Sequence, residues 1–200
     1  MLKVILASKS PRRSQILKEF GYKFSVVTVQ TSELFDKNLS LNNALCEISK
    51  TKVQVYLDYV DQGAIINSLI IGCDTMVCNK GQVLGKPSDE SEAKKYLSEL
   101  SNSTHEVKTA VSLFNTNTKE WLNFVKTSKV KMKTLSEKQI LDYIATGEPM
   151  DKAGAYAIQG LGGKFVESHE GSWYNIVGFP IEEFQEQLKD KGWELELVEK

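Results

Sequence analysis

The chain has 200 residues, of which 41% are hydrophobic, enough for one sizeable globular domain or two small lobes. Its 25 basic and 26 acidic residues are interspersed and leave a formal net charge of −1. This balance argues against a protein organised around a nucleic-acid backbone or an anionic membrane surface, and it predicts that any anion site is local.

Hydrophobic periodicity and turn residues divide the chain into strands and helices. In chain order, the patterns predict a strand at 3–7, a helix at 10–21, a strand at 22–30, a helix at 38–60, a strand with a turn and a short returning strand within 67–85, a helix at 89–101, strands at 105–114 and 121–132, helices at 136–147 and 181–193, and a final strand at 194–199. The two long strands flank the polar turn NTNT, which predicts an antiparallel hairpin. Because strands and helices mix without strict alternation, we expect an α/β or α+β fold with a mixed sheet, in two lobes around a central cleft.

The only two arginines of the chain, Arg12 and Arg13, stand at the start of the predicted helix 10–21. A strand that passes through a small polar turn into a helix directs backbone N–H groups and the positive end of the helix dipole at one point. Guanidinium groups there oppose the dipole, but they offer planar, bidentate donors that suit phosphate. The stretch SKSPRR therefore favours a phosphate site, with a solvated helical turn as the alternative.

Asp74 follows an apolar run at 69–71 and should lie at or just beyond the end of a buried strand. A carboxylate in that position can hold a divalent cation or take a proton from water. It can equally be a turn aspartate that accepts hydrogen bonds from its own backbone. The residue pattern leaves both interpretations open.

The segment TGEPMDKAGAYAIQG at 146–160 gathers Glu148, Asp151, Lys152 and Gln159 between glycines. Two acids and a lysine in such a loop could coordinate Mg²⁺ and a phosphate chain, and the small residues let a ligand approach the backbone closely. A structural loop with one internal ion pair is the alternative.

Cysteine usage and hydropathy bear on location. The three cysteines, Cys46, Cys73 and Cys78, are an odd number without zinc-type spacing, which predicts reduced, mostly buried thiols. The N-terminal apolar run is too short for a secretory signal, and no apolar stretch approaches the ~20 residues of a membrane span. We therefore expect a cytoplasmic protein.

Five stretches, taken together and in order, resemble the signature blocks of the Maf-like nucleotide pyrophosphatases: LASKSPRRSQIL, GCDTMV, LGKP, TGEPMDKAGAYAIQG and GSWYNIVGFP. The resemblance implies one domain over residues 1–200 with an inosine-triphosphate-pyrophosphatase-like α/β fold. It also implies hydrolysis of nucleoside triphosphates to the monophosphate and pyrophosphate with Mg²⁺ or Mn²⁺, by a cytoplasmic homodimer. The residues SPRR, DT and IQG resemble those of the family branch that acts on dTTP and UTP. The resemblance further implies a house-cleaning role toward modified pyrimidine nucleotides. A non-catalytic nucleotide-binding regulator of septum formation is the alternative from another class.

The resemblance also implies roles for single residues. Asp74 matches the family's proton acceptor, and Glu33 matches an acidic residue on the metal side together with Asp74. The family's phosphate-binding positions are matched by Ser8, Arg12, Arg13, Lys52 and Lys86. Of these, Lys52 and Lys86 also count among the catalytic residues. The positions that separate substrate classes are matched by Arg12, Thr75 and Gln159. Ser32-Glu33 replaces the usual Asp-Glu, which changes the expected metal ligands, and Cys73 stands where alanine is common.

Overall fold

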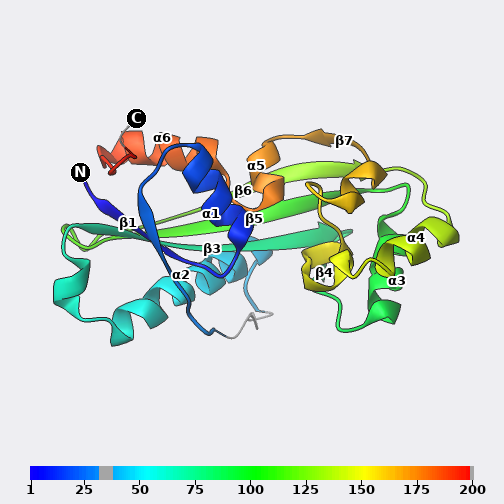
Figure 1. Cartoon of the computed structure of the whole chain (residues 1–200), viewed down its shortest axis with the longest axis horizontal. Helices are drawn as coiled ribbons and strands as arrows, with labels where there is room; N and C mark the ends of the chain where they lie inside the picture. The colour runs from blue at the N-terminus through cyan, green and yellow to red at the C-terminus, as the bar shows by residue number, and fades with distance from the viewer. Residues whose placement is uncertain (32–37, 199–200) are drawn as a thin grey trace. The chain divides into compact units, whose positions relative to one another are not determined.

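The computed structural model describes residues 1–31 and 38–198 of the chain (Figure 1). By internal packing these residues divide into two compact units. The first unit comprises residues 1–74, 109–126 and 178 onward, and the second comprises residues 75–108 and 127–177. The expected single domain and the cleft between its two lobes stay predictions.

Strands and helices mix along the chain as the sequence predicts. The strands are β1 (Lys3–Ala7), β2 (Phe24–Val27), β3 (Ser68–Asn79), β4 (Gln82–Leu84), β5 (Thr104–Asn115), β6 (Trp121–Met132) and β7 (Val166–Glu170). The α-helices are α1 (Pro11–Glu19), α2 (Leu41–Tyr59), α3 (Glu90–Leu100), α4 (Glu137–Ile144), α5 (Trp173–Val177) and α6 (Ile181–Lys191). Short 3-10 turns follow at η1 (Gln62–Ile65), η2 (Glu148–Asp151), η3 (Ala153–Ala155) and η4 (Leu161–Phe165).

Among the described residues, seven strands form one sheet in the order β2-β1-β3-β5-β6-β7, with β4 paired to β3. The β1 strand is parallel to β2 and β3, whereas β4 is antiparallel to β3 and β7 is antiparallel to β6. The predicted α/β class with a mixed sheet is therefore confirmed. No helix in the described part of the chain is both long and apolar enough to cross a bilayer.

The first unit is organised around β1. Its apolar run is buried from Val4 to Ala7, as expected for a strand with neighbours on both sides and both faces covered. Ala7 pairs with Val27 of β2 and with Gly72 of β3. Because β2 and β3 lie on opposite sides of β1, the strand order reverses there. In open α/β sheets such a reversal forms a crevice for ligands at the carboxyl ends of the strands.

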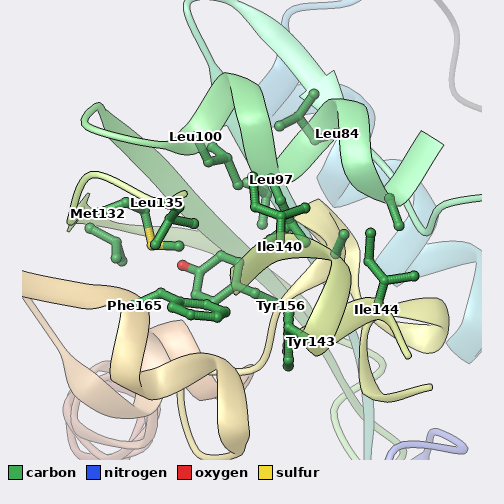
Figure 2. Close-up of a cluster of buried hydrophobic side chains, with 14 of the residues drawn as sticks. Leu84, Leu97, Leu100, Met132, Leu135, Ile140, Tyr143, Ile144, Tyr156 and Phe165 are labelled. Carbon is green, nitrogen blue, oxygen red and sulfur yellow. The ribbon is translucent and has the colours of Figure 1, made fainter. Parts of the chain in front are cut away.

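The core of the second unit is built from α3, α4 and the segments that cover them (Figure 2). Ala93, Leu97 and Leu100 lie on one face of α3, at the helical spacing that the sequence predicts. Tyr143 of α4 meets Phe165 edge to face, with ring centroids 5.1 Å apart. Burial of each large apolar side chain contributes roughly 1.5–3 kcal/mol, so this cluster contributes much of the packing energy of the second unit.

Three features differ from the sequence prediction. The expected final strand at 194–199 is wrong, because residues 194–198 make only two isolated bridges, Leu2–Leu195 and Tyr22–Leu197. Leu2 lies just before β1 and Tyr22 just before β2, so the segment contacts the sheet at two separate points and forms no ladder. The prediction also missed β7 and α5.

Candidate active site

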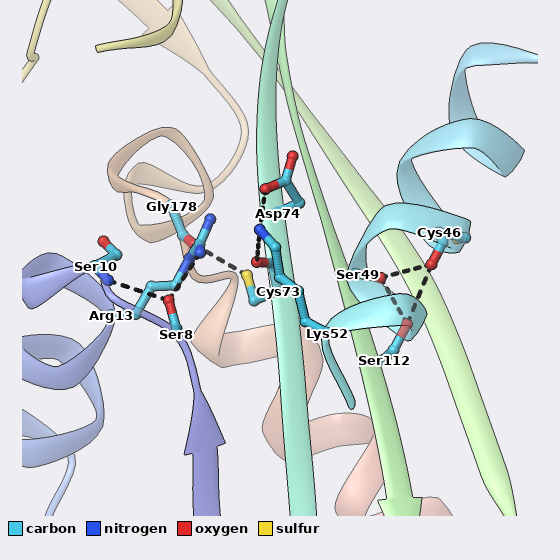
Figure 3. A network of polar contacts seen from close by, with 10 residues as sticks. All are labelled: Ser8, Ser10, Arg13, Cys46, Ser49, Lys52, Cys73, Asp74, Ser112 and Gly178. Atoms are coloured by element: carbon cyan, nitrogen blue, oxygen red, sulfur yellow. Dashed lines mark hydrogen bonds and ion pairs between the residues drawn. The ribbon is translucent and has the colours of Figure 1, made fainter. Parts of the chain in front are cut away.

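The turn between β1 and α1 directs a buried guanidinium at protein oxygens (Figure 3). The Ser8 hydroxyl accepts hydrogen bonds from the Ser10 backbone N–H at 3.2 Å and from Arg13 Nη1 at 3.0 Å. Arg13 Nε donates to the Gly178 carbonyl at 3.0 Å, and the residue is only 8% exposed. These acceptors offset the cost of burying the charge.

The N-terminus of α1 suits an anion. Ser10 is the N-cap residue but its side chain makes no capping hydrogen bond, and the first turn contains no acidic residue. Pro11 occupies the first helical position, where its missing N–H costs nothing. Arg12, half-buried in the same turn, adds positive charge. The remaining N–H groups and the helix dipole therefore favour a phosphate at this point.

Asp74 of β3 forms a short ion pair with Lys52 of α2. Lys52 Nζ lies 2.5 Å from Asp74 Oδ1 and 3.4 Å from the Cys73 carbonyl oxygen (Figure 3). The two side chains are 11% and 15% exposed, so water screens their attraction only in part. The contact fixes the direction of the Asp74 carboxylate.

Close packing of α2 on β3 brings Lys52 to this position. A Cβ atom at Gly72 would collide with the Ser49 carbonyl and would lie 2.8 Å from Val53 Cγ2. The Ser49 and Ser112 hydroxyls, both buried, are 2.6 Å apart and join α2 to β5 (Figure 3). Only glycine at position 72 lets the helix approach the strand this closely.

The Gly178 carbonyl joins the turn at Arg13 to β3. Besides the bond from Arg13, it accepts a hydrogen bond from the Cys73 thiol, with Sγ 3.3 Å from the oxygen. Complete burial raises the pKa of Cys73 to about 11, so the group stays a neutral thiol donor near pH 7. Gly178 has φ +122°, a conformation that favours glycine. Sequence reasoning missed this contact, because nothing in the spacing links position 178 to positions 13 and 73.

Parallel register explains why the first-unit residues gather at one edge of the sheet. Ala7, the last residue of β1, pairs with Gly72 of β3, so Ser8 lies just beyond β1 while Cys73 and Asp74 follow Gly72 within β3. The prediction that Asp74 lies at a strand end is only partly met, because β3 continues to Asn79 and Asp74 lies within it. The structure nevertheless brings Ser8, Arg13, Lys52 and Asp74 into one polar cluster, which we call the first-unit cluster (Figure 3).

The other predicted site residues of the described chain lie in the second unit. Lys86 and Gln159 are exposed, and Thr75 is half-buried in β3 directly after Asp74. Lys152 pairs with its neighbour Asp151, as the structural alternative for this loop predicts. Glu148 accepts hydrogen bonds from Tyr143 and from the backbone of residues 161 and 162. Its predicted role in substrate binding therefore competes with a structural one.

The fit of a divalent metal can be judged at Asp74 alone, because Glu33 lies outside the described residues. Across residues 1–31 and 38–198, no group of three or more His, Cys, Asp or Glu side chains is arranged to hold a metal ion. One carboxylate fits Mg²⁺, which commonly keeps several waters and takes oxygen ligands from substrate phosphates. It does not fit a cation held by protein ligands alone.

Comparison with known proteins bears on the same residues. The sequence model of the family described as "Maf-like protein" matches residues 3–191. A protein of Bdellovibrio bacteriovorus named dTTP/UTP pyrophosphatase is 44% identical over 90% of this chain and 93% of its own. A protein of Caldicellulosiruptor saccharolyticus with the same name is 42% identical over 98% of each chain. A crystal structure described as a nucleoside-triphosphatase / dITP/XTP pyrophosphatase from Mycobacterium abscessus aligns with 96% of this chain and 95% of its own, at 12% identity and a TM-score of 0.43, too weak a likeness to support an argument.

Proposed function

Because the chain belongs to the family of Maf-like proteins, we propose that it hydrolyses dTTP and UTP to the nucleoside monophosphate and pyrophosphate. Relatives named for this activity are 42–44% identical to it over nine-tenths or more of its length. The observation that carries the proposal is the Lys52–Asp74 pair, held in the same cluster as the turn that suits a phosphate.

In the proposed reaction a water molecule attacks the α-phosphorus of the nucleotide. The bond between the α-phosphorus and the bridging oxygen breaks, and pyrophosphate leaves with the electron pair. Asp74 accepts the proton that the water loses, a role typically worth about 10²- to 10⁴-fold in rate. Lys52 acts as a positioning residue, since its ammonium directs one carboxylate oxygen and leaves the other for water.

Several groups would bind the phosphate chain. The N–H groups at the start of α1 would hold one phosphate, and Ser8 and Arg13 would support the turn that presents them. Lys86, exposed beyond β4, would bind the outer phosphates. A divalent cation, Mg²⁺ or Mn²⁺, would be held by Asp74 and Glu33 with the substrate phosphates, and when bound it would neutralise charge on the phosphoanhydride.

Arg12, Thr75 and Gln159 would select the base. Thymine and uracil present an N3–H donor and an O4 acceptor, which a glutamine amide can match with one oxygen and one nitrogen. Cytosine reverses this pattern, so an amide that is held in one orientation would be left with its oxygen and nitrogen unpaired. Modified pyrimidines that keep the uracil edge would be accepted on the same grounds, which is the basis for a house-cleaning role.

A pyrophosphate-release screen tests the proposal. Canonical and modified triphosphates would be offered with Mg²⁺ or Mn²⁺ to the unmodified protein, to Asp74→Asn and to the control Glu167→Gln. We expect dTTP and UTP to be hydrolysed fastest, Asp74→Asn to bind nucleotide without turnover, and the control to match the unmodified protein. Nucleotide binding without release from any triphosphate would favour the non-catalytic regulator instead.

The proposal includes a homodimer that works in the cytoplasm. Sedimentation of the purified protein tests the first part, with a single species of twice the chain mass as the expected result. Fractionation of cells that express the chain tests the second.

A further inference from the structure

Tyr143 and Glu148 form a hydrogen-bonded pair beneath the loop at 157–162 of the second unit. Tyr143 Oη donates to Glu148 Oε1 at 2.7 Å and accepts the Ala157 N–H at 3.3 Å. Glu148 Oε2 accepts the Leu161 N–H at 2.9 Å, and Oε1 accepts the Gly162 N–H at 3.1 Å. The Tyr143 ring is completely buried in the core (Figure 2), so the pair is anchored to the packed part of the unit.

These bonds hold the loop on both sides of Gln159. Residues 157–160 form a turn that is closed by the Gly160 N–H, which donates to the Ala157 carbonyl at 3.2 Å. Tyr143 holds the backbone before Gln159, and Glu148 holds the backbone after it. The Gln159 side chain itself is exposed at the tip of this turn.

Two glycines make the close approach possible. A Cβ atom at Gly160 would lie 2.5 Å from Glu148 Oε1, and one at Gly162 would lie 2.6 Å from Tyr143 Oη. Burial alone would raise the pKa of Glu148, but the Leu161 N–H, the Tyr143 hydroxyl and the Gly162 N–H outweigh it and lower the pKa below its ordinary value. The carboxylate is therefore charged near pH 7, when its hydrogen bonds are strongest.

We propose that Tyr143 and Glu148 are positioning residues for base selection, because they fix the backbone that carries Gln159. The proposal rests on the proposed function, in which Gln159 reads the base. It assigns Glu148 a different task from the direct substrate binding that the sequence predicts. The Glu148 oxygens hold the backbone of the loop at 157–162. The base specificity of Gln159 depends on that fixed backbone.

Hydrogen exchange tests the loop without reference to activity. Tyr143→Phe keeps the ring and removes only the hydroxyl, and Glu148→Gln keeps the shape and removes the charge. Glu167→Gln is the matched control, since that exposed residue pairs with Lys131 on the surface of the same unit. We expect the amides of Ala157, Leu161 and Gly162 to exchange roughly tenfold to a hundredfold faster in the first two variants and unchanged in the control. Unchanged exchange in Tyr143→Phe and Glu148→Gln would overturn the proposal.

Nucleotide selectivity tests the link to Gln159. In both variants the ratio of kcat/KM for UTP to that for CTP should fall about tenfold, toward the ratio of Gln159→Ala, while kcat for UTP falls less. Faster exchange with an unchanged ratio would refute the positioning role and leave a purely structural contact. If the unmodified protein hydrolyses no nucleotide, the proposed function fails, and the exchange measurement still decides whether the pair orders the loop.

Discussion

Replacing Lys52 by Met would leave the Asp74 carboxylate without its counter-charge in a largely dehydrated place. The two side chains are 11% and 15% exposed, nearer to a buried pair than to a surface pair. Removal of one partner of a buried pair typically costs about 3–5 kcal/mol, and an exposed pair contributes less than about 1 kcal/mol. For the intermediate exposure here, we expect Lys52→Met to lower the free energy of unfolding by about 2–4 kcal/mol.

A double-mutant cycle isolates the pair from other effects of the substitution. Asp74→Asn in the Lys52→Met background removes the unpaired charge, so the double variant should recover at least ~1 kcal/mol relative to the sum of the single losses. Urea unfolding followed by tryptophan fluorescence measures each variant, with an unchanged dependence on urea as the check that the unfolded state is comparable. Pyrophosphate release should be lost in the double variant although its stability is partly restored.

One outcome of the double-mutant cycle would refute the assignment of Lys52. If the losses in free energy of unfolding of the two single variants add up to that of the double variant within about 0.5 kcal/mol, Lys52 and Asp74 do not interact energetically. The assignment of Lys52 as the group that directs the Asp74 carboxylate would then be wrong.

Further predictions concern the packing, thiol chemistry and pH response of the fold. Gly72→Ala should lower the free energy of unfolding by at least ~2 kcal/mol, because its Cβ would collide with the Ser49 carbonyl, whereas Gly85→Ala, with no atom within 4 Å, should change the Tm little. Cys73, fully buried and with its pKa raised to about 11, should resist a disulfide reagent at pH 8 until urea unfolds the protein, and rapid labelling of the native state would contradict its burial. Burial lowers the pKa of His105 to about 4, so only the unfolded state binds this proton between about pH 6.5 and 4. As the pH is lowered from about 6.5 to 4, the free energy of unfolding should therefore fall by on the order of 3 kcal/mol. The fall should be smaller in His105→Gln.

Local patterns predicted the secondary structure well where one rule dominated. The helix predicted at 10–21 and the strand, turn and returning strand predicted within 67–85 are all present in the structure. The final strand failed because residues 194–198 form only single bridges, to Leu2 and to Tyr22, and build no continuous ladder with any strand. The short β7 and α5 follow from tertiary packing that no local period encodes.

The candidate site was predictable in its residue types but not in its contacts. The pattern SKSPRR indicated an anion site, and the structure leaves the N-cap of α1 without a side-chain cap. The burial of Arg13 and its bond to Gly178 depend on residues 165 positions apart, which no motif spacing could reveal. For Glu148, carboxylates that bind substrate and carboxylates that order a loop look alike in sequence, because both need glycines nearby.

The Gly178 carbonyl has a consequence for how the protein is made. Ribosomes add about 5–20 residues per second, and domains begin to fold as they emerge. Arg13 and Cys73 are synthesised early, but the oxygen that both of them contact belongs to residue 178 of 200. The first unit likewise draws on residues 1–74, 109–126 and 178 onward. A nascent chain that stalls before residue 178 therefore has Arg13 and Asp74 but not the Gly178 carbonyl, so the first-unit cluster is complete only when translation is almost finished.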